Sequence, residues 1–151
     1  MDKIKTIRGF ARIQLKNPDG SVAHETSFEN NFMDGFRNQV LTAIGNGTGT
    51  VTKPSYIAIG TGTEPGVAAA SLPGVLSDMV AIALSQVSAS SRLRLTASFA
   101  SNVATGNISN MGLYTSNVSN NGLVAGNTFA ASFAKASNQE LSVTYDITFA
   151  S

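Results

Sequence analysis

Cysteine and tryptophan are absent from this chain of 151 residues, and histidine occurs once, at position 24. Without cysteine the chain has no disulfide framework, no thiolate zinc site, no iron–sulfur cluster and no cysteine nucleophile. His24 stands on the apolar face of a predicted strand with Val22 and Phe28, where histidine is more often a tolerated edge residue than a base or a ligand. The residue types that most often mark an active site are therefore scarce.

Charge is also scarce. The chain has ten basic and nine acidic residues, a net charge of +1, and only 13% of its residues are charged, where about 25% is usual. This is not the profile of a protein that binds nucleic acid or a membrane. The uncharged surface must consist of Ser, Thr, Asn, Gly and Ala, which lose little side-chain entropy when another surface covers them. Such a composition suits a protein that packs against neighbours.

Long apolar runs are missing as well. No run approaches the roughly 18 residues of a membrane span, and the start of the chain, MDKIKTIRGF, lacks the continuous apolar core of a signal peptide. We therefore expect a soluble protein made in the cytoplasm. A chain of this length fits one domain over residues 1–151.

The sequence contains no recognisable catalytic, cofactor or metal motif. In YIAIGTGTEPG (56–66) the glycines follow G-x-G-x-x-x-G, and Pro65 and Pro73 interrupt the helix that a dinucleotide site requires. Carboxylates are scattered without D-x-D-x-D spacing. A glycosidase pair from distant strands stays open but has no support in the sequence. We expect a non-enzymatic protein without cofactor or metal, in which residues 56–66 only turn the chain.

The N-terminal residues 1–31 are predicted to form a β-hairpin. Residues 5–16 alternate between apolar and polar, and NPDG (17–20) has the chemistry of a type I turn. A four-residue loop would place Leu15 opposite Val22, and would place Arg12 and Arg8 opposite acidic residues of the second strand, Glu25 and Glu29. Because its outer face is charged, this hairpin is a candidate for a projecting arm.

The rest of the chain predicts one short helix followed by strands. Asp34 and Gly45 suit the two ends of a helix over 34–45, whose apolar face would carry Phe36, Val40 and Ile44. Residues 56–151 hold the main strands, with patterns over 56–60, 81–87, 92–100, 107–116, 122–134 and 141–150. Short strands separated by Asn, Gly and Ser turns indicate an all-β, mainly antiparallel fold, a β-sandwich or jelly roll.

Arginine and lysine are unevenly distributed. Half of the positive charge lies in the first sixteen residues, at Lys3, Lys5, Arg8, Arg12 and Lys16. This cluster is either a basic arm for an acidic partner or nucleic acid, or a solvated strand face that Glu25 and Glu29 neutralise, and we favour the second. Arg92 and Arg94 share one strand face without acids nearby in sequence. They either reach a partner subunit or form a simple exposed face.

The order of several short motifs resembles that of small structural proteins of tailed bacteriophage virions. The motifs are "ENN", "YIAIGTGT", "SLPGVLSD", "LTASFAS", "ISNMGLY" and "LSVTYDITF", and the likeness covers residues 9–150. One departure is visible, because an acidic residue is expected where Asn110 stands before the "GL-aromatic" segment. If that acid makes a buried or intersubunit contact in relatives, this chain must replace it.

The resemblance implies a β-sandwich that coats or caps a larger shell as a decoration (cement) protein, located in the virion after assembly in the host cytoplasm. The implied partners are the phage major capsid protein and copies of the chain itself in a homo-oligomer, with neither membrane nor nucleic acid. Binding is expected through the hairpin, the 45–56 loop and the 61–78 loop. The expected contact residues are Arg8, Arg12, Tyr56, Thr61, Glu64, Arg92 and Arg94.

Two other functions stay open. A tail, baseplate or fibre-attachment protein of the same virion would share these features. A carbohydrate-binding sandwich is less favoured, because the chain has no tryptophan and only three tyrosines to stack on sugars.

Overall fold

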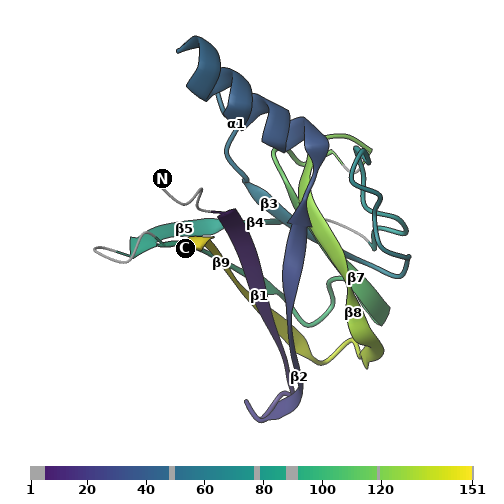
Figure 1. Cartoon of the computed structure of the whole chain (residues 1–151). Coiled ribbons are helices and arrows are strands. Elements are labelled where there is room, and N and C mark those ends of the chain that lie inside the picture. Colours follow the sequence, from purple (N-terminus) through teal and green to yellow (C-terminus); the bar gives the residue numbers. More distant parts are fainter. Residues whose placement is uncertain (1–5, 48–49, 77–78, 88–91, 119, 151) are drawn as a thin grey trace.

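The computed structural model describes residues 6–47, 50–76, 79–87, 92–118 and 120–150. The described residues form nine strands and one helix (Figure 1). In chain order these are β1 (Thr6–Lys16), β2 (Val22–Phe32), α1 (Asp34–Asn46), β3 (Tyr56–Gly60), β4 (Val80–Ala81), β5 (Ala83–Val87), β6 (Arg92–Phe99), β7 (Gly106–Tyr114), β8 (Leu123–Lys135) and β9 (Glu140–Ala150). The predicted all-β class with one short helix is confirmed.

All strands belong to one antiparallel sheet that curls into a nearly closed barrel. The strand order is β4-β3-β7-β8-β2-β1-β9-β6-β5. At one seam β4 pairs with β3 and β5 pairs with β6, so residues 80–87 join the two edges of the sheet. At the other seam β2 and β8 share only two residue pairs and then diverge (Figure 1). The strands thus form one curled, mainly antiparallel sheet, and the sandwich and jelly-roll assignments stay predictions.

The inward side chains fill the barrel in the alternating pattern that the sequence predicts. On β9, Leu141, Val143 and Tyr145 are buried and Ile147 is half-buried. The side chain of Phe149, predicted to continue this series, lies outside the described part of the chain, as do Lys3 and Lys5. On β1 the buried apolar residues are Ala11, Ile13 and Leu15. Because one face of each strand is buried, the alternation of apolar and polar residues determines which side chains point inward.

The N-terminal hairpin forms, but its register differs from the prediction. Gly20 has a left-handed φ of 85° and accommodates a type I turn with a bulge, and a second irregularity follows between Leu15 and Lys16. Consequently Leu15 lies opposite His24, and Arg12 lies opposite Ser27. From Leu15 to the far end of the hairpin the shift amounts to two residues, so these side chains keep their predicted faces. Val22 does not, because it lies opposite Lys16 and is 50% exposed, so its predicted place on the apolar face with His24 is wrong.

The hairpin is not a projecting arm. β1 lies in the middle of the sheet, between β2 and β9, and pairs with β9 along its whole length from Thr6 to Lys16. Its buried inner face is part of the main hydrophobic core. The charged outer face therefore belongs to a strand in the centre of the sheet and does not indicate a projecting arm.

The helix occupies the predicted segment with different ends. Met33 is the N-cap residue, without a side-chain hydrogen bond, and the left-handed residue that ends the helix is Gly47 instead of Gly45. Phe36 and Val40 are half-buried as predicted, whereas Ile44 is 76% exposed because the barrel does not cover that part of α1. No helix among the described residues is long and apolar enough to cross a membrane.

Candidate interaction surface

The outer face of β2, β1, β9 and β6 carries most of the charged residues that the sequence singles out. Phe10 lies at its centre and is 47% exposed. Glu29 of β2 and Asp146 of β9 lie directly opposite Phe10 on the two neighbouring strands. Arg8 and Arg12 flank Phe10 on the same side of β1. We call this surface the arginine face. It comprises Arg8, Phe10, Arg12, Glu25, Glu29, Arg92, Arg94 and Asp146.

Arg8 and Arg12 are ion-paired with β2. Arg12 Nε donates to Glu25 Oε1 at 2.9 Å, and Arg8 Nη1 lies 3.8 Å from Glu29 Oε1. Gln14 Nε2 donates to the other Glu25 oxygen at 2.9 Å. Hydrogen bonds from Arg12 and Gln14 lower the pKa of the Glu25 carboxyl, and the Glu25 carboxylate raises the pKa of Arg12. The predicted neutralisation by Glu25 and Glu29 is thus confirmed for Arg8 and Arg12, with the partners in diagonal instead of facing positions.

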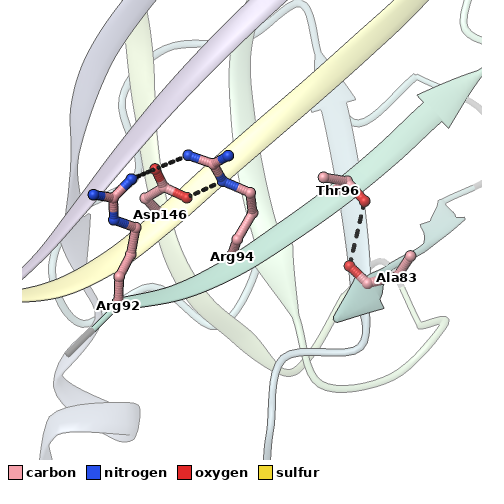
Figure 2. A network of polar contacts seen from close by, with 5 residues as sticks. All are labelled: Ala83, Arg92, Arg94, Thr96 and Asp146. Atoms are coloured by element: carbon pink, nitrogen blue, oxygen red, sulfur yellow. Dashed lines mark hydrogen bonds and ion pairs between the residues drawn. The ribbon is translucent and has the colours of Figure 1, made fainter. Parts of the chain in front are cut away.

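Arg92 and Arg94 share one carboxylate, that of Asp146 (Figure 2). Arg94 donates to Asp146 from Nε at 2.8 Å and from Nη2 at 2.9 Å, and Arg92 Nη1 lies 3.6 Å from Oδ2. The side chain of Asp146 is only 17% exposed. Its pKa is lowered, mainly by the hydrogen bonds from Arg94. Beside this network, Thr96 Oγ1 donates to Ala83 O at 3.4 Å.

Arg92 and Arg94 have no acidic residue nearby in the sequence, but the fold places one beside them. Asp146 is 52 residues away from Arg94 along the chain but directly opposite it in the β6–β9 pairing. Both arginines keep more than a third of their side-chain surface exposed. They can therefore contact a partner only as members of an ion-paired group.

Replacing Asp146 by asparagine is expected to lower the free energy of unfolding by about 1 to 3 kcal/mol at pH 7, because two guanidinium groups lose their carboxylate. The folded-state pKa of Asp146 is depressed, so its contribution is present above the ordinary pKa and is lost as pH falls through the folded value. Urea unfolding of both proteins should therefore show a gap at pH 7 that shrinks below about pH 4. Glu25→Gln, which removes a more exposed carboxylate with a single arginine partner, is the control and should change stability less.

The remaining predicted contact residues lie elsewhere. Tyr56 is half-buried on β3 and packs against the smaller core cluster. Thr61 is exposed at the start of the 61–76 loop, and its backbone N–H donates to Gly74 O at 2.9 Å. Glu64 accepts a hydrogen bond of 2.9 Å from Asn31 of β2. Only the four arginines are gathered on one face.

Phe10 is the member of this face that the sequence reading missed. It occupies a position where alternation places a polar residue, between Arg8 and Arg12. An aromatic residue on the polar side of an otherwise regular strand was the available signal.

Asn110 on β7 fixes the loop that follows β3. It is fully buried, and its Nδ2 donates to Thr63 O at 3.0 Å and to Pro73 O at 2.8 Å. Ser109 Oγ donates to Gly62 O at 2.7 Å. No helix follows Gly62 within residues 62–76. The glycine-rich segment thus turns the chain and is held by side chains of β7, as the sequence predicts.

His24 is half-buried, and its ring centroid lies 4.6 Å from that of Phe133. This contact suits the predicted role as an edge residue. Within the part of the chain that the structure describes, no group of three or more His, Asp or Glu side chains is arranged to hold a metal ion.

The fold and this surface define a small, single-sheet β-barrel with an ion-paired face centred on an aromatic residue. No protein-family model matches the chain, and no curated protein is significantly similar to it. We therefore infer its function from the surface itself.

Proposed function

We propose that this protein is a structural virion protein that binds the head shell of a tailed phage as a decoration (cement) protein, without catalysing a reaction. The observation that carries the proposal is Phe10, 47% exposed at the centre of the arginine face. Arginine and aromatic side chains are enriched in protein interfaces, and residues that dominate binding lie near the centre of the contact. The resemblance to virion structural proteins supports the choice of partner.

The charge balance of the arginine face favours a protein partner. Its four arginines are matched by three carboxylates, and each arginine has an ion-pair partner within the chain. Binding to a phosphate backbone requires uncompensated cations. An almost neutral surface of alternating charges suits the mixed polar surface of another protein, whose charges can be interleaved with it.

Small hydroxyl residues next to Arg12 support the same conclusion. Ser27 and Thr144 lie on either side of Arg12 in the sheet, and Thr96 lies beyond Thr144. These side chains lose little conformational entropy when they are covered. A ligand that binds the assembled shell but not its separated subunits stabilises the shell by mass action.

Phe10→Ser tests this proposal. Shells stripped of the protein are incubated with purified wild type or variant, and bound protein and the temperature of shell rupture are measured. We expect the variant to bind at least about tenfold more weakly and to leave the shell unstabilised. Val22→Ser is the control, because Val22 is 50% exposed and should be replaceable without effect.

Three results would contradict the proposal. Phe10→Ser could bind as well as wild type, or shells could rupture at the same temperature with and without the protein. The third is a copy number far below that of the shell subunit, measured by gel-band stoichiometry of intact particles. Such a copy number would indicate a tail or baseplate protein.

A further inference from the structure

Helix α1 leaves large apolar side chains in water. Leu41 is 65% exposed and Ile44 is 76% exposed, both on the half of the helix that extends beyond the strands (Figure 1). Val67 lies at the start of the helix, where its carbonyl accepts a hydrogen bond from the backbone of Asp34, and it is 53% exposed. Single exposed apolar residues are common, but neighbouring ones on one helix indicate a contact surface.

A groove runs beside this helix. It has a volume of about 570 Å³ and lies between α1, the start of β1 and the end of β2. Its apolar wall includes Phe32 and Phe36, whose rings are stacked at 5.5 Å, together with Val40, Leu41 and Val67. Exposed apolar residues and an apolar hollow therefore occupy the same surface.

Asn30 also lines the groove, at its inner end. The residue is only 7% exposed, and its side-chain amide lies beside the Tyr145 hydroxyl in the interior of the barrel. The amide is therefore turned towards the core, and the groove presents mainly apolar side chains to whatever fills it.

We propose that this groove is a self-association surface, and that its occupant is α1 of a second copy of the chain. A two-fold dimer requires one patch that holds both the protruding and the receiving parts, so that each copy inserts into the other. Leu41 and Ile44 provide the protruding part, and the wall of Phe32, Phe36 and Val40 provides the hollow.

The charges around the groove allow two identical patches to face each other. Arg37 Nη1 lies 3.5 Å from Asp34 Oδ1, and Arg8 Nη1 lies 3.8 Å from Glu29 Oε1. Each cation is matched by an anion, so a copy of this patch meets no net charge of its own sign. Phe10 is not part of the groove, whereas Arg8 and Glu29 belong to both the groove and the arginine face. The substitutions that test the two surfaces, at Phe10 and at Leu41 and Ile44, are therefore at different positions.

Sedimentation equilibrium of the full chain over a range of concentrations tests the inference. We expect wild type to dimerise. The double variant Leu41→Gln/Ile44→Gln should dimerise roughly a hundredfold more weakly, about tenfold for each apolar contact that is lost. Glutamine keeps helix propensity close to that of leucine. Val22→Gln/Val118→Gln removes similarly exposed apolar residues and should dimerise like wild type.

Chemical cross-linking provides a second measurement, in which Ile44 and every residue of the groove wall except Leu41 stay unchanged. Because the chain contains no cysteine, Leu41→Cys introduces a single thiol that a short bis-maleimide can join to its copy. We expect a covalent dimer from Leu41→Cys and none from Val118→Cys. Circular dichroism confirms that each variant keeps the fold.

The inference is overturned if wild type stays monomeric at its highest soluble concentration, if the double variant dimerises as strongly as wild type, or if Leu41→Cys yields no covalent dimer. A monomeric wild type whose double variant no longer binds shells would assign α1 to the shell instead. Phe10→Ser should remain dimeric, so failure of the shell proposal and failure of the dimer are distinguishable.

Discussion

Asn110→Asp is expected to lower the free energy of unfolding by about 3 to 5 kcal/mol at pH 7, because it places an unpaired charge at a buried site. Asn110 is fully buried, and both hydrogens of its Nδ2 are donated, to Thr63 O and Pro73 O. An ionised carboxylate has no hydrogen to donate and would face these two carbonyl oxygens. The loop after β3 would lose its anchor on β7, which urea unfolding monitored by circular dichroism would detect.

The pH dependence of this variant identifies the cause. Burial should raise the pKa of the new carboxyl, because it disfavours the charged form. Hydrogen bonding should raise the pKa further, because only the protonated form can donate to the loop. The folded state then binds more protons than the unfolded state, so stability falls as pH rises from the ordinary aspartate pKa of about 3.9 towards the raised value. We expect the difference from wild type to be smaller at pH 4 than at pH 7.

Asn107→Asp is the matched control. Asn107 is also on β7, but it is exposed and makes one long hydrogen bond, 3.4 Å from Nδ2 to Ser132 Oγ. Its replacement should change stability by no more than about 0.5 kcal/mol. Equal stability of the two variants would show that the loop does not depend on the Asn110 amide. It would also remove the physical reason why this chain has asparagine where the resemblance predicts an acid.

Alternation alone predicted the inward faces of the long strands, because a register error of one residue would expose every apolar side chain of β1 or β9. The hairpin shows the limit of that signal. A shift of two residues keeps Leu15 inside and Arg12 outside, so the hydrophobic pattern could not separate the predicted register from the observed one. The turn at Gly20 and the irregularity between Leu15 and Lys16 each add one residue and together set the observed register.

The order of the strands could not be predicted in this way. Period-two patterns show that β6 and β9 exist but not that they are neighbours. The sequence therefore found Arg92 and Arg94 as cations without finding Asp146, which long-range pairing places opposite Arg94. The near-closure of the sheet through residues 80–87 could not be predicted for the same reason, since this one short segment pairs with two strands that lie far apart in the sheet order.

The helix illustrates a different limit. The spacing of Phe36, Val40 and Ile44 correctly predicted a helix, but a spacing does not say what covers the apolar face. The barrel covers Phe36 and Val40 in part and leaves Ile44 in water. A residue that fits the pattern and stays exposed is a signal of association that only the structure reveals.

Gly9→Ala is expected to destabilise the fold by about 3 kcal/mol, at the upper end of the usual cost of overpacking a core. An added Cβ at Gly9 would collide with the hydroxyl of Tyr145 and lie 2.7 Å from its Cζ. Tyr145 is fully buried and belongs to the main core cluster, so its ring cannot move aside without disturbing its neighbours. Glycine is required here by the close approach of β1 to that ring.

Tyr145→Phe separates this steric cause from a general loss of strand stability. The Tyr145 hydroxyl is buried and lacks a partner at hydrogen-bond geometry, so its removal should be neutral or stabilising. In the Gly9→Ala background it should restore part of the lost stability, because the nearest colliding atom disappears while Cζ remains close. A double-mutant cycle measured by urea unfolding gives this coupling directly.

Gly45→Ala is the matched control for the glycine substitution. An added Cβ at Gly45 would meet no atom within 4 Å, and the residue lies within α1. Alanine there should stabilise the protein by about 0.5 to 1 kcal/mol, since it favours the helix and restricts the unfolded chain. If Gly9→Ala behaved like Gly45→Ala, β1 would not lie against the Tyr145 ring. If Tyr145→Phe gave no rescue, the crowding would come from the ring carbons and not from the hydroxyl.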